Sequence, residues 1–235
     1  MSHHPLSTTG YPTPKPVTLE GKYVRLEILE DRHLQQLFDA GVGDEERFRY
    51  MWDSPPKDVE DIKKWAVSGK QAIWNKGEVP YAVVDKSTGR VEGRQTLMSI
   101  FPEHGRIEIG RIFWGKKIMR SRVTTESIFL IARHVFEDLG YRRLEWTCNA
   151  ENEASRRAAA RFGFEFEGKL RQWMVCKGVN RDNMWFSILD HEWKDIKAGY
   201  EQWLQENNFD DAGNQKEKLV TRGRKSEEKV IMLSQ

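Results

Sequence analysis

The sequence Ile107-Glu108-Ile109-Gly110-Arg111-Ile112-Phe113 is followed by the basic stretch from Gly115 to Arg122 and then by Thr124-Thr125-Glu126. A short apolar strand thus leads through a cationic turn directly into the start of a helix. The first backbone N–H groups of a helix lack internal partners, and the helix dipole favours negative charge there. The order therefore predicts an anion site, with a ligand that carries phosphate groups as its natural occupant.

The basic turn contributes four side chains, Lys116, Lys117, Arg120 and Arg122. The alternative interpretation is a run of charge that is simply solvated. We favour the anion site because the cluster immediately precedes a helix N-terminus in a strand–turn–helix order.

The strand before this turn has an irregular pattern. Ile107 and Ile109 share one face, Glu108 and Gly110 share the other, and the alternation fails at Arg111. A glycine followed by a broken period is typical of a β-bulge. A bulge here would part this strand from its parallel neighbour and open a slot.

Composition limits the class of protein. The chain has 235 residues, 38% of them hydrophobic, which suits one large domain. A net charge of +2 makes nucleic acid an unlikely partner, and the chain has no apolar run long enough to span a membrane. Two cysteines cannot form a disulfide framework, which predicts the cytoplasm, with the nucleus left open. No His or Cys spacing predicts a metal site.

Local patterns divide the chain into an expected flexible arm (1–17), a domain (18–208) and a charged, disordered tail (209–235). Strands are expected near 23–28, 81–84, 91–100, 106–113, 144–148, 165–175 and 183–189, and helices near 31–38, 44–76, 124–139, 151–161 and 191–206. Short connections predict antiparallel neighbours, whereas the helix 124–139 between two strands predicts a parallel pair. The expected fold is α+β: a mixed, mostly antiparallel sheet with a central splayed parallel pair, flanked by helices.

Four pieces of the sequence carry a resemblance: Leu19 to Leu26, Glu108-Ile109-Gly110, Asn152 to Arg157 followed by Phe162-Gly163-Phe164, and Asp182 to Trp193. In this order and spacing they resemble the GNAT family of acyl-CoA-dependent N-acetyltransferases, in particular its RimJ/RimL-like branch. The resemblance covers about residues 20–195. It implies a GNAT-like fold, acetyl-CoA as co-substrate and no metal.

One stretch departs from the family pattern. The family's phosphate loop reads (Arg or Gln)-x-x-Gly-x-(Gly or Ala), and the corresponding residues here are Met119-Arg120-Ser121-Arg122-Val123-Thr124. Arg122 and Thr124 fill the two small positions, where glycine lets backbone amides approach a pyrophosphate closely. We expect Arg120 and Arg122 to compensate with charge-assisted hydrogen bonds to phosphate.

The family reaction is the attack of an amine on a thioester. The resemblance makes Glu108 the candidate base, acting through a water. The alternative is a carboxylate on an exposed strand face, paired with Arg94 or Arg106. The backbone N–H groups of Ile112, Phe113 and Trp114 are implied to bind the thioester oxygen or the pantetheine arm, and their alternative is ordinary ladder pairing.

Asn152 and Ser155 carry over from the family as contacts to the cofactor arm, although Asn152 also suits a helix cap. The related RimI branch has a tyrosine acid at the position that Ala159 occupies here, so no acid is expected there. The wall that binds the amine is expected within residues 31–76. Trp52, Trp65 and Trp74 either line this wall or pack in the core.

The residues and the resemblance together favour an acetyl-CoA-dependent N-acetyltransferase. Its acceptor would be a primary amine, either a protein N-terminus or a small molecule. The first alternative is a non-catalytic acyl-CoA-binding regulatory module, because the phosphate loop lacks glycine and no general acid is evident. The second is an interaction protein that works through the stretch 216–229. The identity of the amine and the oligomeric state, including a homodimer, stay open.

Overall fold

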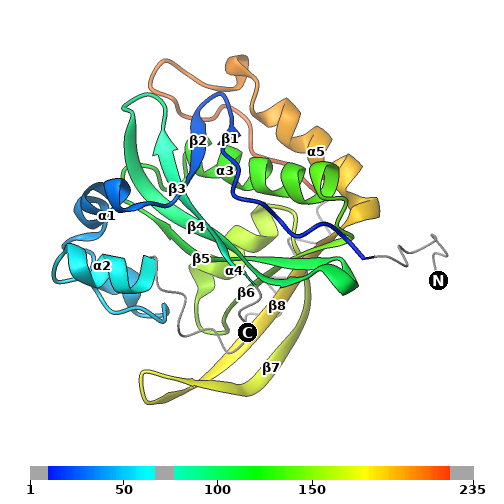
Figure 1. The fold of residues 1–235 in the computed structure, drawn as a ribbon. Coiled ribbons are helices and arrows are strands. Elements are labelled where there is room, and N and C mark those ends of the chain that lie inside the picture. Colours follow the sequence, from blue (N-terminus) through cyan, green and yellow to red (C-terminus); the bar gives the residue numbers. More distant parts are fainter. Residues whose placement is uncertain (1–9, 67–76, 223–235) are drawn as a thin grey trace.

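One mixed sheet organises the molecule, with the strand order β1-β2-β3-β4-β5-β6-β8-β7 (Figure 1). The computed structural model describes residues 10–66 and 77–222. The strands are β1 (Leu19–Glu20), β2 (Val24–Ile28), β3 (Val79–Asp85), β4 (Arg90–Phe101), β5 (Arg106–Trp114), β6 (Arg143–Asn149), β7 (Glu165–Cys176) and β8 (Val179–Leu189). The α-helices of the described residues are α1 (Leu34–Gly41), α2 (Val59–Ala66), α3 (Arg122–Arg133), α4 (Glu153–Arg161) and α5 (Asp190–Trp203).

The central pair β5–β6 is parallel, and all other neighbouring strands are antiparallel. Parallel pairing begins at Arg106↔Arg143 and ends at Glu108↔Glu145. Both strands continue beyond this point, β5 to Trp114 and β6 to Asn149. The predicted α+β fold with a splayed central pair is confirmed.

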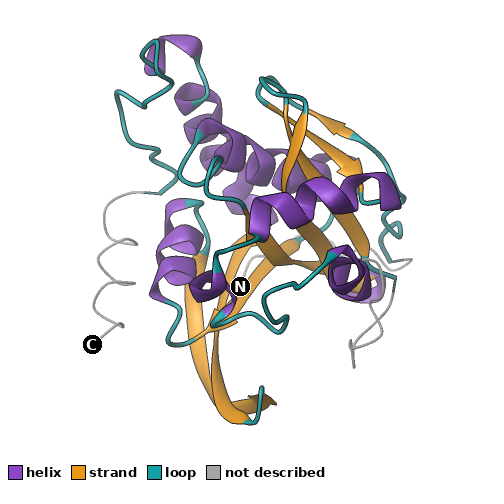
Figure 2. Ribbon diagram, turned by 90° about the vertical axis from the view of Figure 1, so that its left-hand side faces the viewer, coloured by secondary structure: helices purple, strands orange, loops and turns teal. Residues whose placement is uncertain are grey.

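The middle of the sheet is buried on both faces, and β3 shows how its sequence achieves this. Tyr81 and Val83 belong to the core that contains α3 and α5, whereas Ala82 and Val84 belong to a second core with α1 and α2. Successive side chains of a strand point to opposite faces, so an uninterrupted apolar run serves both cores. Figures 1 and 2 show these two groups of helices on either side of the sheet.

The predicted bulge is present in β5. Arg111 has a φ of 49°, and the β4–β5 register shifts between Arg94 and Thr96. Ile107 and Ile109 lie in the core with α3, but Phe113 lies in the core with α1. Because a bulge adds one residue to a strand, it reverses the side-chain alternation beyond it.

Helix α3 is tied to the β1–β2 hairpin through a buried carboxylate. The Glu126 side chain accepts backbone N–H bonds from Lys22 (2.8 Å), Tyr23 (2.6 Å) and Val24 (2.9 Å). A Cβ at Gly21 would lie 2.6 Å from this carboxylate. Glycine therefore permits the close approach that lets one side chain satisfy three turn amides.

The C-terminal boundary of the folded domain differs from the expectation of a tail from residue 209. Phe209 and Leu219 are buried in the core, and Arg222 pairs with Glu192 at 2.6 Å. A Cβ at Gly199 would lie 2.1 Å from the carbonyl oxygen of Val220, so glycine in α5 gives this segment its path. A few apolar residues anchor a stretch whose charge favoured disorder. Residues 223–235 lie outside the described part of the chain.

The N-terminal boundary also differs from the expected arm 1–17. The Tyr11 backbone N–H donates to the Pro102 carbonyl at 3.0 Å, and its ring lies 5.5 Å from that of Tyr141. Pro14 is buried. This segment therefore packs on the domain from residue 10 onwards, whereas residues 1–9 lie outside the described part of the chain.

Candidate active site

A slot opens where β5 and β6 part. Beyond the Glu108↔Glu145 pair, neither strand has a ladder partner on its facing edge within the described residues. The stretch Ile112–Trp114 lies on this open part of β5. In an antiparallel ladder alternate N–H groups point away from the partner, so donors of β5 face the slot rather than β4. On the other edge Phe113 and Trp114 do pair with Arg94 and Gly93 of β4, so the alternative of ladder pairing holds on that edge, and a contact with a ligand stays a prediction.

Two further donors come from elements next to the parted strands, the end of β5 and the helix α4 that follows β6. The indole Nε1–H of Trp114 and the Nε–H of Arg156 are buried without a hydrogen-bond partner among the described residues. Trp114 is the last residue of β5, and Arg156 lies in α4, which follows β6. Buried donors are normally satisfied, so unpaired ones suit a polar ligand.

Glu108 is the last β5 residue with a parallel partner, and only 8% of its surface is exposed. Its Oε2 accepts a hydrogen bond from Ser99 Oγ at 2.9 Å, and its Oε1 accepts one from Thr147 Oγ1 at 2.7 Å. Burial raises the pKa of Glu108, while the two hydroxyl donors act in the opposite direction. The carboxylate is thus placed at the mouth of the slot with a stronger affinity for a proton.

The alternative interpretation of Glu108 is wrong. Its strand face is not exposed, and neither arginine considered as a partner forms an ion pair with it. Arg94 pairs with Asp53, and Arg106 pairs with Glu145 at 3.1 Å.

The loop before α3 has the geometry of a helix N-terminus. The Ser121 side chain caps α3 by accepting the Val123 N–H at 3.1 Å. Arg120 has a φ of 57°, so the left-handed position of this loop precedes both sites where the family has small residues. Met119 is exposed, whereas Val123 and Thr124 are buried in the first turn of α3.

The cations of this loop have different environments. Arg120 is exposed, and its side chain has no partner within the described residues. The guanidinium of Arg122 lies over the Tyr23 ring at 4.4 Å, and its contact with phosphate stays a prediction. Lys116 and Lys117 lie 3.8 Å and 3.4 Å from Asp44 and Glu92. Arg120 therefore remains as the available cation of the loop.

Asn152 and Ser155 lie at the start of α4. Asn152 Oδ1 accepts the Ser155 backbone N–H at 3.0 Å, so the helix-cap interpretation of Asn152 is confirmed. Ser155 Oγ accepts a hydrogen bond from Trp146 Nε1 at 3.1 Å. These bonds fix both side chains beside β6, and their contact with a cofactor stays a prediction.

The segment between α1 and α2 is held in place by the β7–β8 hairpin. Lys177 Nζ donates to the carbonyls of Phe48 (2.8 Å) and Asp53 (2.9 Å), at the far end of this hairpin. The Arg181 guanidinium lies 5.4 Å from the Trp52 ring, which is 46% exposed. Figure 2 shows how far the hairpin extends beyond the rest of the sheet. The side chain of Trp65 and all of Trp74 lie outside the described part of the chain.

Sequence reasoning missed an aromatic pair on this side of the sheet. Trp185 on β8 is the cross-strand neighbour of Thr147, and its ring meets that of Trp173 edge-on at 5.2 Å. Directly paired residues share a face of the sheet, so these rings lie on the face of Glu108 and Thr147. The alternation of β8 carried this signal, but the length of the hairpin did not follow from it.

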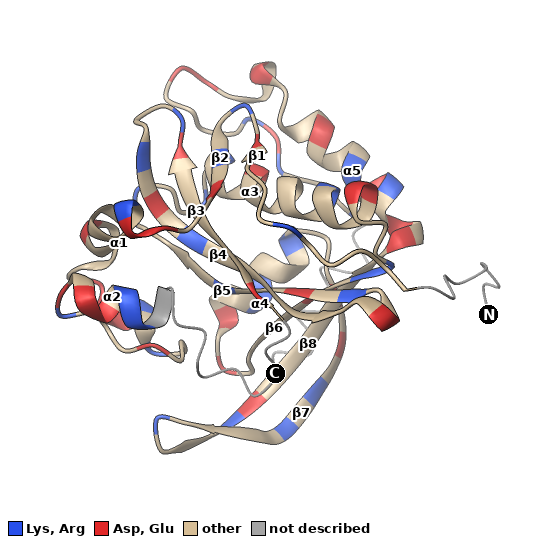
Figure 3. Ribbon diagram, in the orientation of Figure 1, with Lys and Arg blue, Asp and Glu red and all other residues tan. Residues whose placement is uncertain are grey.

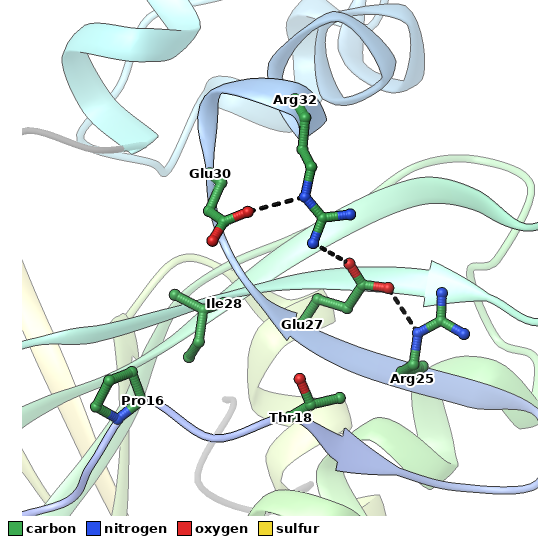
Figure 4. A pocket seen from close by; sticks show the side chains of 7 residues that line it. All are labelled: Pro16, Thr18, Arg25, Glu27, Ile28, Glu30 and Arg32. Atoms are coloured by element: carbon green, nitrogen blue, oxygen red, sulfur yellow. Dashed lines mark hydrogen bonds and ion pairs between the residues drawn. The ribbon is translucent and has the colours of Figure 1, made fainter.

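A separate pocket of about 360 Å³ lies beside β2 and is lined by Pro16, Thr18, Arg25, Glu27, Ile28, Glu30 and Arg32 (Figure 4). Its charges are matched internally, because Glu27 accepts from both arginines and Glu30 accepts from Arg32. It lies three strands away from β5 in the sheet order. We therefore assign the candidate active site to the slot and not to this pocket.

Charges of both signs are interspersed along the described elements (Figure 3). Within residues 10–66 and 77–222, no group of three or more His, Cys, Asp or Glu side chains is arranged to hold a metal ion. None of the helices found there is long and apolar enough to cross a membrane.

Residues 24–165 match the family model of the acetyltransferase (GNAT) domain. The chain belongs to the GNAT acetyltransferase family. This GNAT protein is similar to a crystal structure of a GCN5-related N-acetyltransferase from Brucella melitensis, with 47% identity, a TM-score of 0.85, and coverage of 90% of this chain and 96% of that chain. A probable acetyltransferase of the GNAT family from Chromobacterium violaceum shares 34% identity with a TM-score of 0.74, over 83% of this chain and 98% of that one.

A curated relative of this GNAT protein is the "Putative ribosomal N-acetyltransferase YdaF" of Bacillus subtilis, 28% identical over 110 residues. That match covers 46% of this chain and 59% of YdaF. The likeness agrees with the RimJ/RimL-like branch. The chain is thus an N-acetyltransferase, and the predicted family and fold are confirmed.

Proposed function

We propose that this acetyltransferase takes the acetyl group from acetyl-CoA and transfers it to a primary amine, with the thioester in the slot and Glu108 as the general base. The observation that carries this proposal is the end of β5–β6 pairing at Glu108 itself. The candidate base Glu108 thus lies where the open edge of β5 begins. Acetyl-CoA, when bound, supplies the activated acetyl group.

The residues around the slot fit such a ligand. The backbone donors of Ile112, Phe113 and Trp114 would bind the pantetheine arm and the thioester oxygen. The capped start of α3, with Met119, Arg120 and Ser121, would bind the pyrophosphate, and the backbone of Val123 and Thr124 would add to it. Arg122 supports this loop through its ring contacts. Asn152 and Ser155 would border the arm from α4.

Glu108 would remove a proton from the protonated amine, through a water, because only the neutral amine carries a lone pair for attack. The new C–N bond would form at the thioester carbon while the C–S bond breaks, and the departing coenzyme A thiolate would take up the second proton that the nitrogen loses. Burial raises the pKa of Glu108 and so increases the affinity of the carboxylate for a proton.

The acceptor would lie on the face of the sheet that carries Glu108. Trp185, Trp173 and Trp52 offer apolar surface there for the body of the amine. A protein N-terminus and a small-molecule amine both remain candidates, and the name of YdaF makes ribosomal proteins a first choice to assay. A cytoplasmic location and a homodimer stay predictions.

Two measurements test the function. Calorimetry with acetyl-CoA should show binding to the wild-type chain. A thiol-release assay over a panel of amines and N-terminal peptides should then find an acceptor, with Glu108→Gln as the inactive control. Binding without thiol release for any acceptor would favour the non-catalytic regulatory module instead.

A further inference from the structure

Both oxygens of Glu108 are held by hydroxyl groups that come from different strands. Ser99 Oγ reaches Oε2 from β4 at 2.9 Å, and Thr147 Oγ1 reaches Oε1 from β6 at 2.7 Å. The carboxylate is therefore fixed in position and in rotation. We propose that Ser99 and Thr147 are positioning residues that aim the carboxylate of Glu108 at the acceptor amine, an inference that rests on the proposed function of Glu108.

Ser99 has an unusual backbone. Its φ is 47°, and it lies in the stretch between Met98 and Phe101 where the β4–β5 register shifts. A non-glycine residue in the left-handed region costs conformational energy, which persists only where the surroundings enforce it. Here the irregular backbone directs the Ser99 hydroxyl at Glu108, across a ladder whose regular register would direct it elsewhere.

The hydrogen bond from Thr147 spans the slot between β6 and β5. Thr147 lies two residues beyond Glu145, the last β6 residue paired with β5, yet its hydroxyl still contacts Glu108. This bond joins the two strands just after their backbones part. Thr147 thus fixes the width of the slot at its mouth as well as the direction of the carboxylate.

The two hydroxyl bonds from Ser99 and Thr147, here called the clamp, leave Glu108 able to accept a further hydrogen bond. An ionised carboxylate has about four lone-pair sites, and two hydroxyl donors leave about two of them for a water or an amine. Hydroxyl donors stabilise the charged form, whereas burial disfavours it. The two hydroxyl bonds thus oppose the effect of burial, which is the larger of the two and raises the pKa of Glu108.

The test uses variants that remove one hydroxyl at a time. Thr147→Val removes the donor and keeps the β-branched shape, and Thr147→Ser restores the donor. Ser99→Gly removes the hydroxyl and accepts a positive φ without strain, so the backbone effect is separated from the hydrogen bond. Ser187→Ala is the matched control, because it removes a 2.6 Å hydroxyl–carboxylate bond to Glu167 on the neighbouring strands.

Two readouts are compared. Carbon-13 NMR follows the titration of the Glu108 carboxylate in the free protein, with the signal assigned by its loss in Glu108→Gln. Steady-state kinetics follows kcat/KM against pH with an amine found in the panel assay. Thermal denaturation confirms that each variant is folded.

Thr147→Val and Ser99→Gly should each raise the pKa of Glu108 and shift the acidic limb of the kcat/KM profile upwards. Activity at neutral pH should fall by about tenfold or more, as expected for a lost hydrogen bond to a charged group. Thr147→Ser should recover both values, and Ser187→Ala should change neither. If both hydroxyl-free variants keep the wild-type titration and profile, the clamp is refuted. If the wild type shows no transfer, the proposed function fails, while the NMR titration still tests the clamp.

Discussion

Arg94 on β4 and Asp53 in the segment before α2 form a buried ion pair, in which Arg94 is only 1% exposed. Burial lowers the pKa of Arg94 to about 10, against the opposing effect of the Asp53 charge. The pair joins the proposed acceptor wall to the sheet that carries Glu108. It therefore couples the stability of the domain to the shape of the acceptor side.

Asp53→Asn should destabilise the protein by about 3 to 5 kcal/mol, because it breaks a buried ion pair by removing the charge of one partner. The exposed pair Arg90–Asp39, at 3.3 Å, offers a matched control. Asp39→Asn should cost about 0 to 1 kcal/mol. Urea denaturation measures both values, and equal small effects would show that the buried pair is not important for stability.

The raised pKa of Glu108 predicts a pH dependence of stability. Between the ordinary pKa of a glutamate and the raised one, the folded state binds more protons than the unfolded chain. The free energy of unfolding therefore falls as the pH rises through this window. Urea denaturation at a series of pH values measures the free energy of unfolding of the wild type and of Glu108→Gln. As the pH rises through this window, the wild type should lose stability relative to Glu108→Gln. A difference that grows in the wild type's favour would mean that the pKa of Glu108 is lowered.

Alanine substitutions of the two arginines of the phosphate loop should differ in their effects on acetyl-CoA affinity and on stability. Arg120→Ala should weaken acetyl-CoA binding by about tenfold, or about 1.4 kcal/mol, and reduce its sensitivity to salt. Arg122→Ala should leave the affinity nearly unchanged and cost about 1 kcal/mol of stability, because its guanidinium contacts two aromatic rings. Calorimetry at two salt concentrations decides, and an equal loss of affinity in both variants would place Arg122 on the phosphates.

The segment after α5 should behave as part of the domain. Leu219 is 4% exposed and its neighbour Val220 is 67% exposed. Leu219→Ala should cost about 2 to 4 kcal/mol, whereas Val220→Ala should change stability by less than about 0.5 kcal/mol. Thermal and urea denaturation of the two variants compare them directly. If both substitutions have negligible effects on stability, the segment after α5 is not part of the folded domain, as expected from the sequence.

Local sequence patterns were sufficient to predict the strands and helices at the centre of the fold. Alternation in β5 located its strand and its bulge, because a bulge leaves a break in a period of two. The capping preference of asparagine located the start of α4. The strand–helix–strand order also predicted the parallel pair, since that connection leaves few other topologies.

Contacts between distant parts of the chain could not be predicted. The Arg94–Asp53 pair joins a strand to a loop 41 residues away, and nothing in either local sequence marks the partner. Ser99 and Thr147 read as ordinary strand residues, because their meeting at Glu108 depends on a register shift and on the parting of β5 from β6. Leu219 was hidden by the charges around it.

The most direct test of the account is a crystal structure of the protein with coenzyme A. We predict that β5 and β6 stay parted beyond Glu108, with the pantetheine arm along Ile112–Trp114 and the pyrophosphate at the start of α3. Strands that pair continuously past Glu108, with no nucleotide between them, would contradict it.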